Sequence, residues 1–313
     1  HEQALEITRK HGLRQLEGAC VGGIAMLHHD QGNYEEAEKH YEESIAISDE
    51  AGDRRFKGHT LTNLAHLYHN TGRVPEALEY LQTALTIHRE EGDRRFEGIT
   101  LGAIADLYDI QGLIPKALDY YNQALRIHRE VGNRRFEAYI LCGLAQIYAL
   151  QDQPQKGIQN IEMSIVIFRE VGHRRGEGLA LGKLGILHLS QDAFDLAENC
   201  LTEAIAITEE IWLGASGAFR GALGVIQARK GKLSEAKDLL EKGEPQVRGF
   251  DQHEVGRFLC AKAEVYVLAG HPDIAQSALE EAETIANETK ASENSHLMRS
   301  IAKARCALSD IHP

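Results

Sequence analysis

The sequence has little proline, little cysteine, a deficit of positive charge and no long apolar run, and each shortage excludes a class of protein. Only six of the 313 residues are proline and no Ser/Pro-rich tract occurs, so a long disordered segment is not expected. No apolar run approaches the roughly 18 residues of a membrane-spanning helix, and no signal peptide opens the chain. We therefore expect a folded protein that does not cross a membrane.

Cysteine is scarce and irregularly placed. The five cysteines are odd in number and form no CxxC pair; they are Cys20, Cys142, Cys200, Cys260 and Cys306. Such a pattern indicates free thiols in a reducing compartment rather than a disulfide framework or a zinc site. The expected localisation is therefore cytoplasmic.

Basic residues are outnumbered by acidic ones. The chain has 34 Lys and Arg against 47 Asp and Glu, which gives a formal net charge of −13. A phosphate backbone requires a clustered Lys/Arg surface, so nucleic-acid binding is not expected. The same acidity disfavours binding to anionic membranes.

Signatures of catalysis are missing as well. No GxxxxGK[ST] phosphate loop occurs, because Gly182-Lys183 and Gly231-Lys232 lack the following Ser or Thr, and there is no GxSxG elbow. Cys142 would need a nearby histidine to act as a nucleophile, and none occupies the matching face of its own or the preceding repeat. We predict that the protein is not an enzyme and uses no cofactor.

What the chain does have is a repeat of 40 residues. A glycine, a pair of arginines and an isoleucine each recur at this spacing, at Gly52, Gly92, Gly132 and Gly172, at Arg54-Arg55, Arg94-Arg95, Arg134-Arg135 and Arg174-Arg175, and at Ile47, Ile87, Ile127, Ile167 and Ile207. Self-similarity at one fixed period is the signature of a solenoid. Stacked repeats build extended binding surfaces more often than active sites.

Each repeat contains two helical stretches. Apolar residues recur at helical spacing over residues 53–70 and again over 74–91, with Gly72 and Pro75 at the turn between them. Gly92 suits the left-handed position after a helix, and Asp93 suits the N-cap of the next one. The same start and stop signals occur at Gly52-Asp53 and at Gly132-Asn133. No strand pattern competes, so the predicted fold class is all-α.

The pattern Leu64-Ala65, Tyr68, Gly72, Ala77, Leu81, Ala84 resembles the tetratricopeptide repeat (TPR). The 40-residue unit is similar to the extended repeats of Pins/LGN-type adaptors and of bacterial TPR signalling proteins. This resemblance implies a right-handed superhelix of about seven helix-turn-helix repeats with a C-terminal capping helix.

The repeat register predicts four segments. Residues 1–12 form the second helix of a truncated repeat, 13–210 five regular units, 211–288 two degenerate units, and 289–313 a capping helix and tail. The chain starts with His1 rather than Met, so we expect the native protein to continue upstream. An N-terminal helix without its partner would leave an apolar face open, so self-association through that end is a further expectation.

Family resemblance implies that the first helix of each pair lines a concave groove, and that partners bind at its non-packing positions. The candidate partner-binding residues are His59, Asn63, His66, His69, Asp106, Asp109, Tyr139, Gln146, Lys183 and Ile186. The family often carries Asn at the place of Asn63, but Ala103, Gly143 and Lys183 replace it in later units. This departure argues against capture of a peptide C-terminus by a carboxylate clamp.

Two residue groups have alternative interpretations. His29, His59, His66 and His69, with Asp106, could bind a transition metal, but the sequence lacks HExxH and paired cysteines, so we interpret them as polar groove surface without a metal. The repeated arginine pairs could hold an acidic partner, but glutamates recur beside them. Interleaved charges of this kind favour ion pairs between repeats.

Three functions remain open from the sequence. The favoured one is a non-catalytic interaction module that binds a peptide or partner protein in the groove. A second is a ligand-sensing array of a larger bacterial signalling protein with an NTPase or protease effector. A third, a metal or thiol enzyme, would require bound metal or a reactive Cys142.

Overall fold

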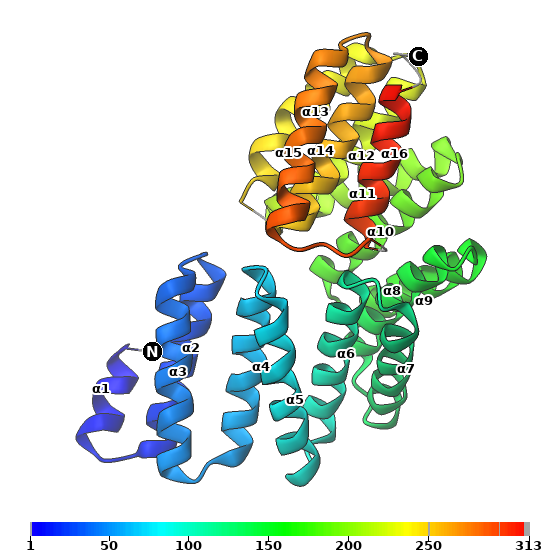
Figure 1. The fold of residues 1–313 in the computed structure, drawn as a ribbon. Coiled ribbons are helices and arrows are strands. Elements are labelled where there is room, and N and C mark those ends of the chain that lie inside the picture. The colour runs from blue at the N-terminus through cyan, green and yellow to red at the C-terminus, as the bar shows by residue number, and fades with distance from the viewer. Residues whose placement is uncertain (1, 250, 294, 310–313) are drawn as a thin grey trace. The chain divides into compact units, whose positions relative to one another are not determined.

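The computed structural model describes residues 2–249, 251–293 and 295–309, which form sixteen α-helices and no strand (Figure 1). The helices are α1 (Glu2–Lys10), α2 (Arg14–Asp30), α3 (Tyr34–Ala51), α4 (Arg54–Asn70), α5 (Val74–Glu90), α6 (Arg94–Ile110), α7 (Ile114–Glu130), α8 (Arg134–Leu150), α9 (Pro154–Glu170), α10 (Arg174–Ser190), α11 (Phe194–Ile211), α12 (Leu213–Arg229), α13 (Leu233–Val247), α14 (Gln252–Leu268), α15 (Pro272–Glu288) and α16 (His296–Ser309). The predicted all-α solenoid of helix pairs is confirmed. Residues 310–313 of the predicted tail lie outside the described residues.

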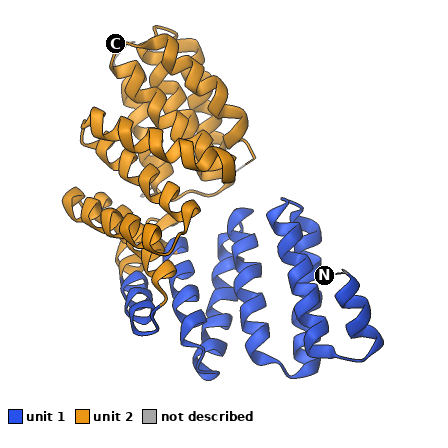
Figure 2. Ribbon diagram, turned by 180° about the vertical axis from the view of Figure 1, so that it is seen from behind, with its two compact units in different colours: residues 1–107, 119–132 blue, residues 108–118, 133–313 orange. Residues whose placement is uncertain are grey.

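Two compact units make up the chain (Figure 2). Unit 1 contains residues 1–107 and 119–132, and unit 2 contains residues 108–118 and 133–313. Within each unit, consecutive helices form antiparallel pairs that stack side by side (Figure 1). No described helix is long and apolar enough to span a bilayer.

Local signals define the helix ends as the sequence predicts. Gly52 and Gly92 both have φ of +69°, a left-handed conformation that glycine adopts without the steric cost of a side chain. Asp53 then caps α4 by accepting a hydrogen bond from the Phe56 N–H, and Asp93 accepts one from Phe96 at the start of α6. Asn133 is the exception, because its side chain makes no cap hydrogen bond to α8.

The even-numbered helices lie on the inner side of the stack. In unit 2, α8 contacts α10, α10 contacts α12, α12 contacts α14 and α14 contacts α16. In unit 1, α2 contacts α4, and the Thr62 hydroxyl of α4 lies 3.2 Å from that of Thr100 on α6. We call these even-numbered helices the inner helices and their odd-numbered partners the outer helices. The inner helices are the ones that family resemblance assigned to the groove.

Small residues allow each inner helix to pack closely on its outer partner. Ala65 and Ala77, from the two helices of one pair, are fully buried, and the larger Tyr68 is buried beside them. At the position equivalent to Ala77, Gly157 has so little space that a Cβ would lie 2.9 Å from the carbonyl oxygen of Ala145. The small residues therefore let the two helices of a pair approach closely.

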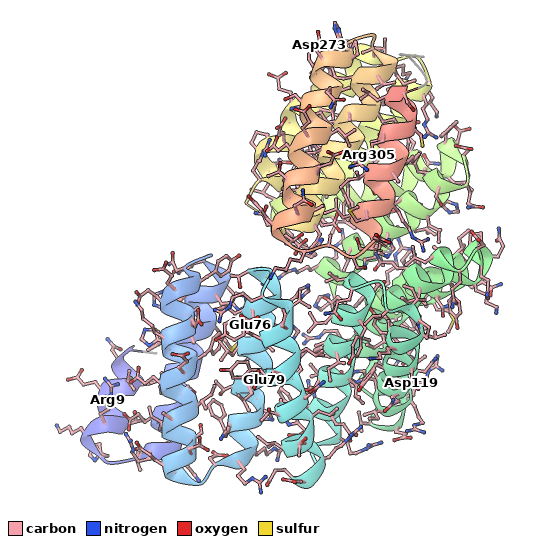
Figure 3. All side chains as sticks on the ribbon, viewed as in Figure 1. Arg9, Glu76, Glu79, Asp119, Asp273 and Arg305 are labelled. Atoms are coloured by element: carbon pink, nitrogen blue, oxygen red, sulfur yellow. The ribbon has the colours of Figure 1, made fainter. Side chains whose placement is uncertain are left out.

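The arginine pairs take part in ion pairs along the stack. The first arginine of a pair joins the start of an inner helix to the end of its outer partner; Arg54 contacts Glu90, and Arg94 contacts Glu130 at 2.6 Å. Arg9 contacts both Glu17 and Glu43 and lies at the surface together with other charged side chains (Figure 3). The contacts of Arg9, and that of Arg55 with Asp93, join adjacent repeats as predicted, whereas those of Arg54 and Arg94 join the two helices of one repeat.

The C-terminal helices follow the same plan with weaker signals. Trp212 replaces the expected glycine; its extended backbone (φ −161°) joins α11 directly to α12, and the Arg175 guanidinium lies 4.1 Å from its ring centre. Helix α16 buries Leu297, Ile301 and Ala304 and exposes a polar face. It packs on α14 and α15 as an inner helix would, so it closes the stack as predicted.

Candidate partner-binding face

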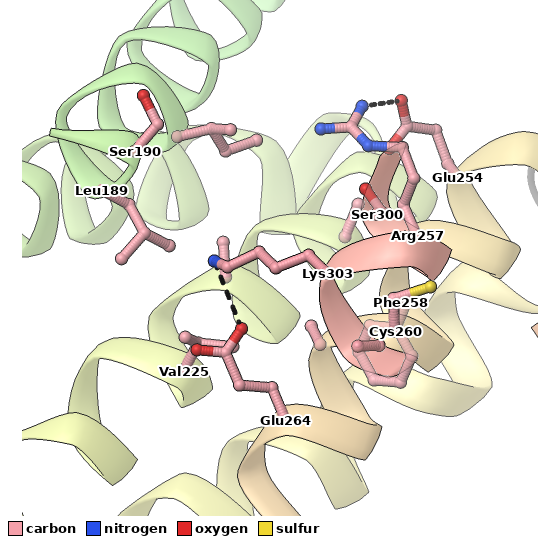
Figure 4. A pocket seen from close by; sticks show the side chains of 15 residues that line it. Leu189, Ser190, Val225, Glu254, Arg257, Phe258, Cys260, Glu264, Ser300 and Lys303 are labelled. Atoms are coloured by element: carbon pink, nitrogen blue, oxygen red, sulfur yellow. Dashed lines mark hydrogen bonds and ion pairs between the residues drawn. The ribbon is translucent and has the colours of Figure 1, made fainter. Parts of the chain in front are cut away.

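A hollow of about 240 Å³ opens on the inner helices of unit 2 (Figure 4). Four helices line it: α10, α12, α14 and α16. Its apolar lining comes from Ile186, Leu189, Ala218, Ala222, Val225, Phe258, Ala261 and Ala304. Alanines on α12 leave the space that larger side chains would fill, so the hollow follows from the sequence of that helix.

Phe258 is held in the wall by a glycine of the neighbouring inner helix. A Cβ on Gly221 would lie 2.6 Å from Cδ2 of Phe258, so the ring packs directly against the α12 backbone. The same arrangement occurs one helix earlier, where Phe219 covers Gly182. Each glycine thus lets an aromatic ring of the next inner helix pack against the backbone.

Charged side chains surround the apolar lining. Glu264 accepts hydrogen bonds from Arg229, and Lys303 Nζ lies 3.4 Å from its other carboxylate oxygen. Arg257 donates to Glu254 at 2.8 Å on another side of the hollow (Figure 4). The hollow thus has an apolar centre with paired charges around it.

Four of the predicted residues, Asp109, Gln146, Lys183 and Ile186, lie on or near this face. Ile186 lines the hollow, and Lys183, one turn earlier on α10, donates a hydrogen bond from Nζ to the Gln146 side-chain oxygen on α8. Asp109 is buried in unit 2, with Oδ1 3.6 Å from Nε2 of His296 at the start of α16. The interhelix contacts of Lys183 and Asp109 place both side chains within the packing of the stack.

Tyr139 lies at a seam between repeats rather than in the hollow. Its ring centre is 4.9 Å from that of Phe168 and 5.8 Å from that of His173. Burial in this cluster raises the pKa of the Tyr139 hydroxyl. The residue therefore contributes to packing between two consecutive helix pairs.

In unit 1, His59 also lies at a seam. Its ring stacks on Phe96 with 3.6 Å between centres, and its Nε2 lies 3.1 Å from Oδ2 of Asp93. The neighbouring His88 is fully buried, and this burial lowers its pKa to about 4. His88 is therefore a neutral imidazole at neutral pH.

The remaining predicted residues of unit 1 are half-buried or exposed. Burial lowers the pKa of His66 to about 4, and the nearby His69 and His29 add to this effect. Asn63 is half-buried, whereas Asp106 is exposed and accepts a hydrogen bond from the Tyr121 hydroxyl. The structure thus groups three histidines on the inner helices α2 and α4 and separates them from His59.

Sequence reasoning missed most of the hollow. Its lining on α12, α14 and α16 includes Ala222, Phe258 and Lys303, all C-terminal to the regular repeats that contain the predicted residues. The predicted degenerate units at 211–288 already include this pair, with Gly270 and Ala275 at its turn and second helix, but the sequence offered no signal for which of its side chains line the hollow.

Comparison with known families decides the assignment of the chain. A sequence model described as tetratricopeptide repeat matches residues 19–74, 56–130 and 136–210. The chain belongs to the tetratricopeptide repeat family. A second model, described as anaphase-promoting complex subunit 5, matches only residues 250–303 of this TPR protein. No curated protein matches the sequence.

Solved structures share the fold at low sequence identity. Aspartyl phosphate phosphatase F from Bacillus subtilis is 16% identical, with a TM-score of 0.67, 90% of this chain covered and 73% of that one. The Rap conjugation gene regulator of plasmid pLS20, in complex with the Phr* peptide, is 14% identical, with a TM-score of 0.65 and coverage of 90% and 78%.

A signal transduction ATPase from Pyrococcus horikoshii with a tetratricopeptide repeat sensor is a third structural neighbour. It is 17% identical, with a TM-score of 0.58. The match covers 86% of this chain but only 41% of the ATPase. At these identities the three likenesses establish the TPR solenoid fold alone.

Proposed function

We propose that this TPR protein is a cytoplasmic, non-catalytic interaction module that holds a peptide or an extended segment of a partner protein on its inner helices. The observation that carries the proposal is the apolar hollow between α10, α12, α14 and α16. In the proposed complex, an apolar side chain of the partner fills the hollow, and its polar backbone faces the surrounding charges.

The chemistry of the lining supports this mode of binding. Ala222 and Ala261 are only partly buried, so apolar surface is available to a partner. Arg257, Glu254 and Lys303 can exchange their present ion pairs for contacts with peptide groups, because none of them is fully buried. All five cysteines are free thiols, which agrees with the proposed reducing compartment.

The structural neighbours support the proposal by analogy of fold. The plasmid pLS20 regulator shares the solenoid and is complexed with a peptide. The likeness to the Pyrococcus ATPase favours a second candidate, in which the TPR array is the sensor part of a larger signalling protein. Both functions use the inner face, and they differ in what the array is attached to.

Selection of peptides from a displayed random library tests the proposal. Peptides enriched on the wild-type protein should contain an apolar anchor and should lose at least about tenfold in affinity with Ala222→Arg, which places a charge in the hollow. Ala302→Arg is the matched control, because it puts the same side chain on an exposed position of α16. Equal loss with both variants, or no loss with Ala222→Arg, would reject the hollow as the site.

A further inference from the structure

A separate cluster of potential metal ligands lies in unit 1, at the seam between two repeats. His59 of α4, His88 of α5 and Asp93 before α6 place one ligand atom each within 4.8 Å of the other two. In the part of the chain that the structure describes, these are the only three such residues grouped so closely. Their elements are distinct, so a shared ion would tie two helix pairs together.

The geometry of the cluster is close to what a transition metal needs. His59 Nε2 and Asp93 Oδ2 are 3.1 Å apart. Two ligands at about 2.0–2.2 Å from a tetrahedral zinc ion are themselves separated by roughly 3.3–3.6 Å. Only small movements of the side chains would therefore bring these atoms into a coordination sphere.

The hydrogen bonds around His88 leave the lone pair of its Nδ1 available to a metal ion. The Thr62 hydroxyl donates to the Gly58 carbonyl, and its oxygen lies 3.3 Å from Nε2 of His88. Nε2–H can then donate to that oxygen, which leaves Nδ1 unprotonated. His88 is 0% exposed, and its Nδ1 has no hydrogen-bond partner among the described residues. A buried, neutral imidazole oriented by an outer hydrogen bond is the form in which histidine binds metals.

His59 is more exposed to solvent than His88 and Asp93, which would leave a coordination position accessible to water. Asp93 is 5% exposed, and the side chain of His59 is 21% exposed. Water can therefore reach the cluster from the His59 side and complete the coordination sphere. Imidazole and carboxylate ligands together suit zinc, nickel or copper better than calcium or magnesium.

One cation already competes for the site. Arg55 Nε lies 2.8 Å from Oδ2 of Asp93, the same oxygen that His59 approaches. The Arg55 side chain is 65% exposed, so it can turn into solvent when a metal binds. Its positive charge lowers the affinity for a cation without excluding one.

The three residues coincide at this seam alone among the regular repeats. The equivalent positions hold Ala19, Ser48 and Asp53 one repeat earlier and Ile99, His128 and Asn133 one repeat later. In the repeat after that they hold Tyr139, Phe168 and His173. The repeat framework therefore does not require this combination of side chains.

We propose that His59, His88 and Asp93 form a binding site for a divalent transition metal of the zinc class, with water at the remaining position. The bound ion links α4, α5 and the start of α6. It thereby fixes the angle between two adjacent repeats.

Titration of tag-free, chelator-treated protein with Zn²⁺ alone, followed by calorimetry, tests this site. We expect one ion per chain. The variants His59→Ile, His88→Phe and Asp93→Asn should each bind at least about tenfold more weakly, since loss of an outer-shell partner alone costs about 10–100-fold. Each replacement already stands at the same repeat position elsewhere in this chain, in Ile99, Phe168 and Asn133, so each variant should fold.

Two control variants and a spectroscopic probe separate the seam from other histidines. His128→Phe and a His66→Ala/His69→Ala double variant should leave Zn²⁺ affinity unchanged, and Arg55→Ala should increase it several-fold. Co²⁺ in place of Zn²⁺ should give the visible absorption of a site with nitrogen and oxygen ligands, absent in His88→Phe. No binding by the wild type, binding that persists in His88→Phe, or binding lost in the His66/His69 variant would each overturn the proposal.

Discussion

Two glycines on one helix should differ in how much stability is lost when each is replaced by alanine. Gly221 and Gly224 both lie inside α12. A Cβ at position 221 would meet Phe258 Cδ2 at 2.6 Å, whereas at position 224 the nearest atom, the carbonyl oxygen of Ala236, would be 3.3 Å away. Ala improves helix propensity by about 1 kcal/mol at either site, so this contribution cancels when the two variants are compared.

The difference between the variants therefore measures the packing of Phe258 on the α12 backbone. Overpacking of a close contact costs about 1–3 kcal/mol. We expect Gly224→Ala to lie within about 1 kcal/mol of the wild type, because the approach to the Ala236 carbonyl oxygen offsets part of the gain in helix propensity. We expect Gly221→Ala to be about 1–3 kcal/mol less stable than Gly224→Ala.

Urea unfolding followed by circular dichroism, with both variants measured side by side, provides the assay. Hydrogen exchange of the α12 amides reports the same difference locally, which matters because long repeat arrays do not always unfold in one step. Equal unfolding midpoints and equal exchange for the two variants would refute the close packing of Phe258 against Gly221.

Two further predictions concern titration and ion pairs. Folding lowers the pKa of His88 from 6.5 to about 4, so between these pH values only the unfolded chain binds a proton at this residue. The free energy of unfolding should therefore fall by up to about 3 kcal/mol as the pH is lowered from 6.5 to 4. The variant His88→Phe should show a smaller fall in the urea unfolding midpoint over this range. An unchanged pH dependence in His88→Phe would contradict this. The side chain of Glu97 is 8% exposed and pairs with Arg89 and Arg94, so Glu97→Ala should lower the free energy of unfolding by about 1–3 kcal/mol. Glu90 forms an exposed pair with Arg54, so Glu90→Ala should lower it by less than about 1 kcal/mol. Equal thermal unfolding shifts for these two variants would contradict the difference in burial.

The helix pairs could be predicted from sequence because their signals are local. Gly52 and Asp53 determine where one helix ends and the next begins through the conformation of a few neighbouring residues. Buried alanines and tyrosines recur at fixed spacing for the same reason. Asn133 shows the limit, since a residue of suitable type at the right position does not make the predicted cap.

The candidate site was harder to predict than the helix pairs, because its shape depends on which side chains fill the space between neighbouring helices. The repeat period places His59 and Tyr139 at equivalent positions of their helices. It does not say that Phe96 and Phe168 pack against them at the seams. The alanine-lined hollow lies where the repeat register weakens after Trp212, so it was outside the predicted set apart from Ile186.

Site-specific photo-crosslinking tests the central claim, binding on the inner helices, most directly. A benzophenone amino acid would replace Leu189 at the hollow on α10 or, as the matched control, the exposed Leu196 on the outer helix α11. The two proteins would be irradiated with the library-selected peptide and the products identified by mass spectrometry. We predict a cross-linked peptide from position 189 and none from 196. Cross-linking from position 196 without any from 189 would contradict binding on the inner face.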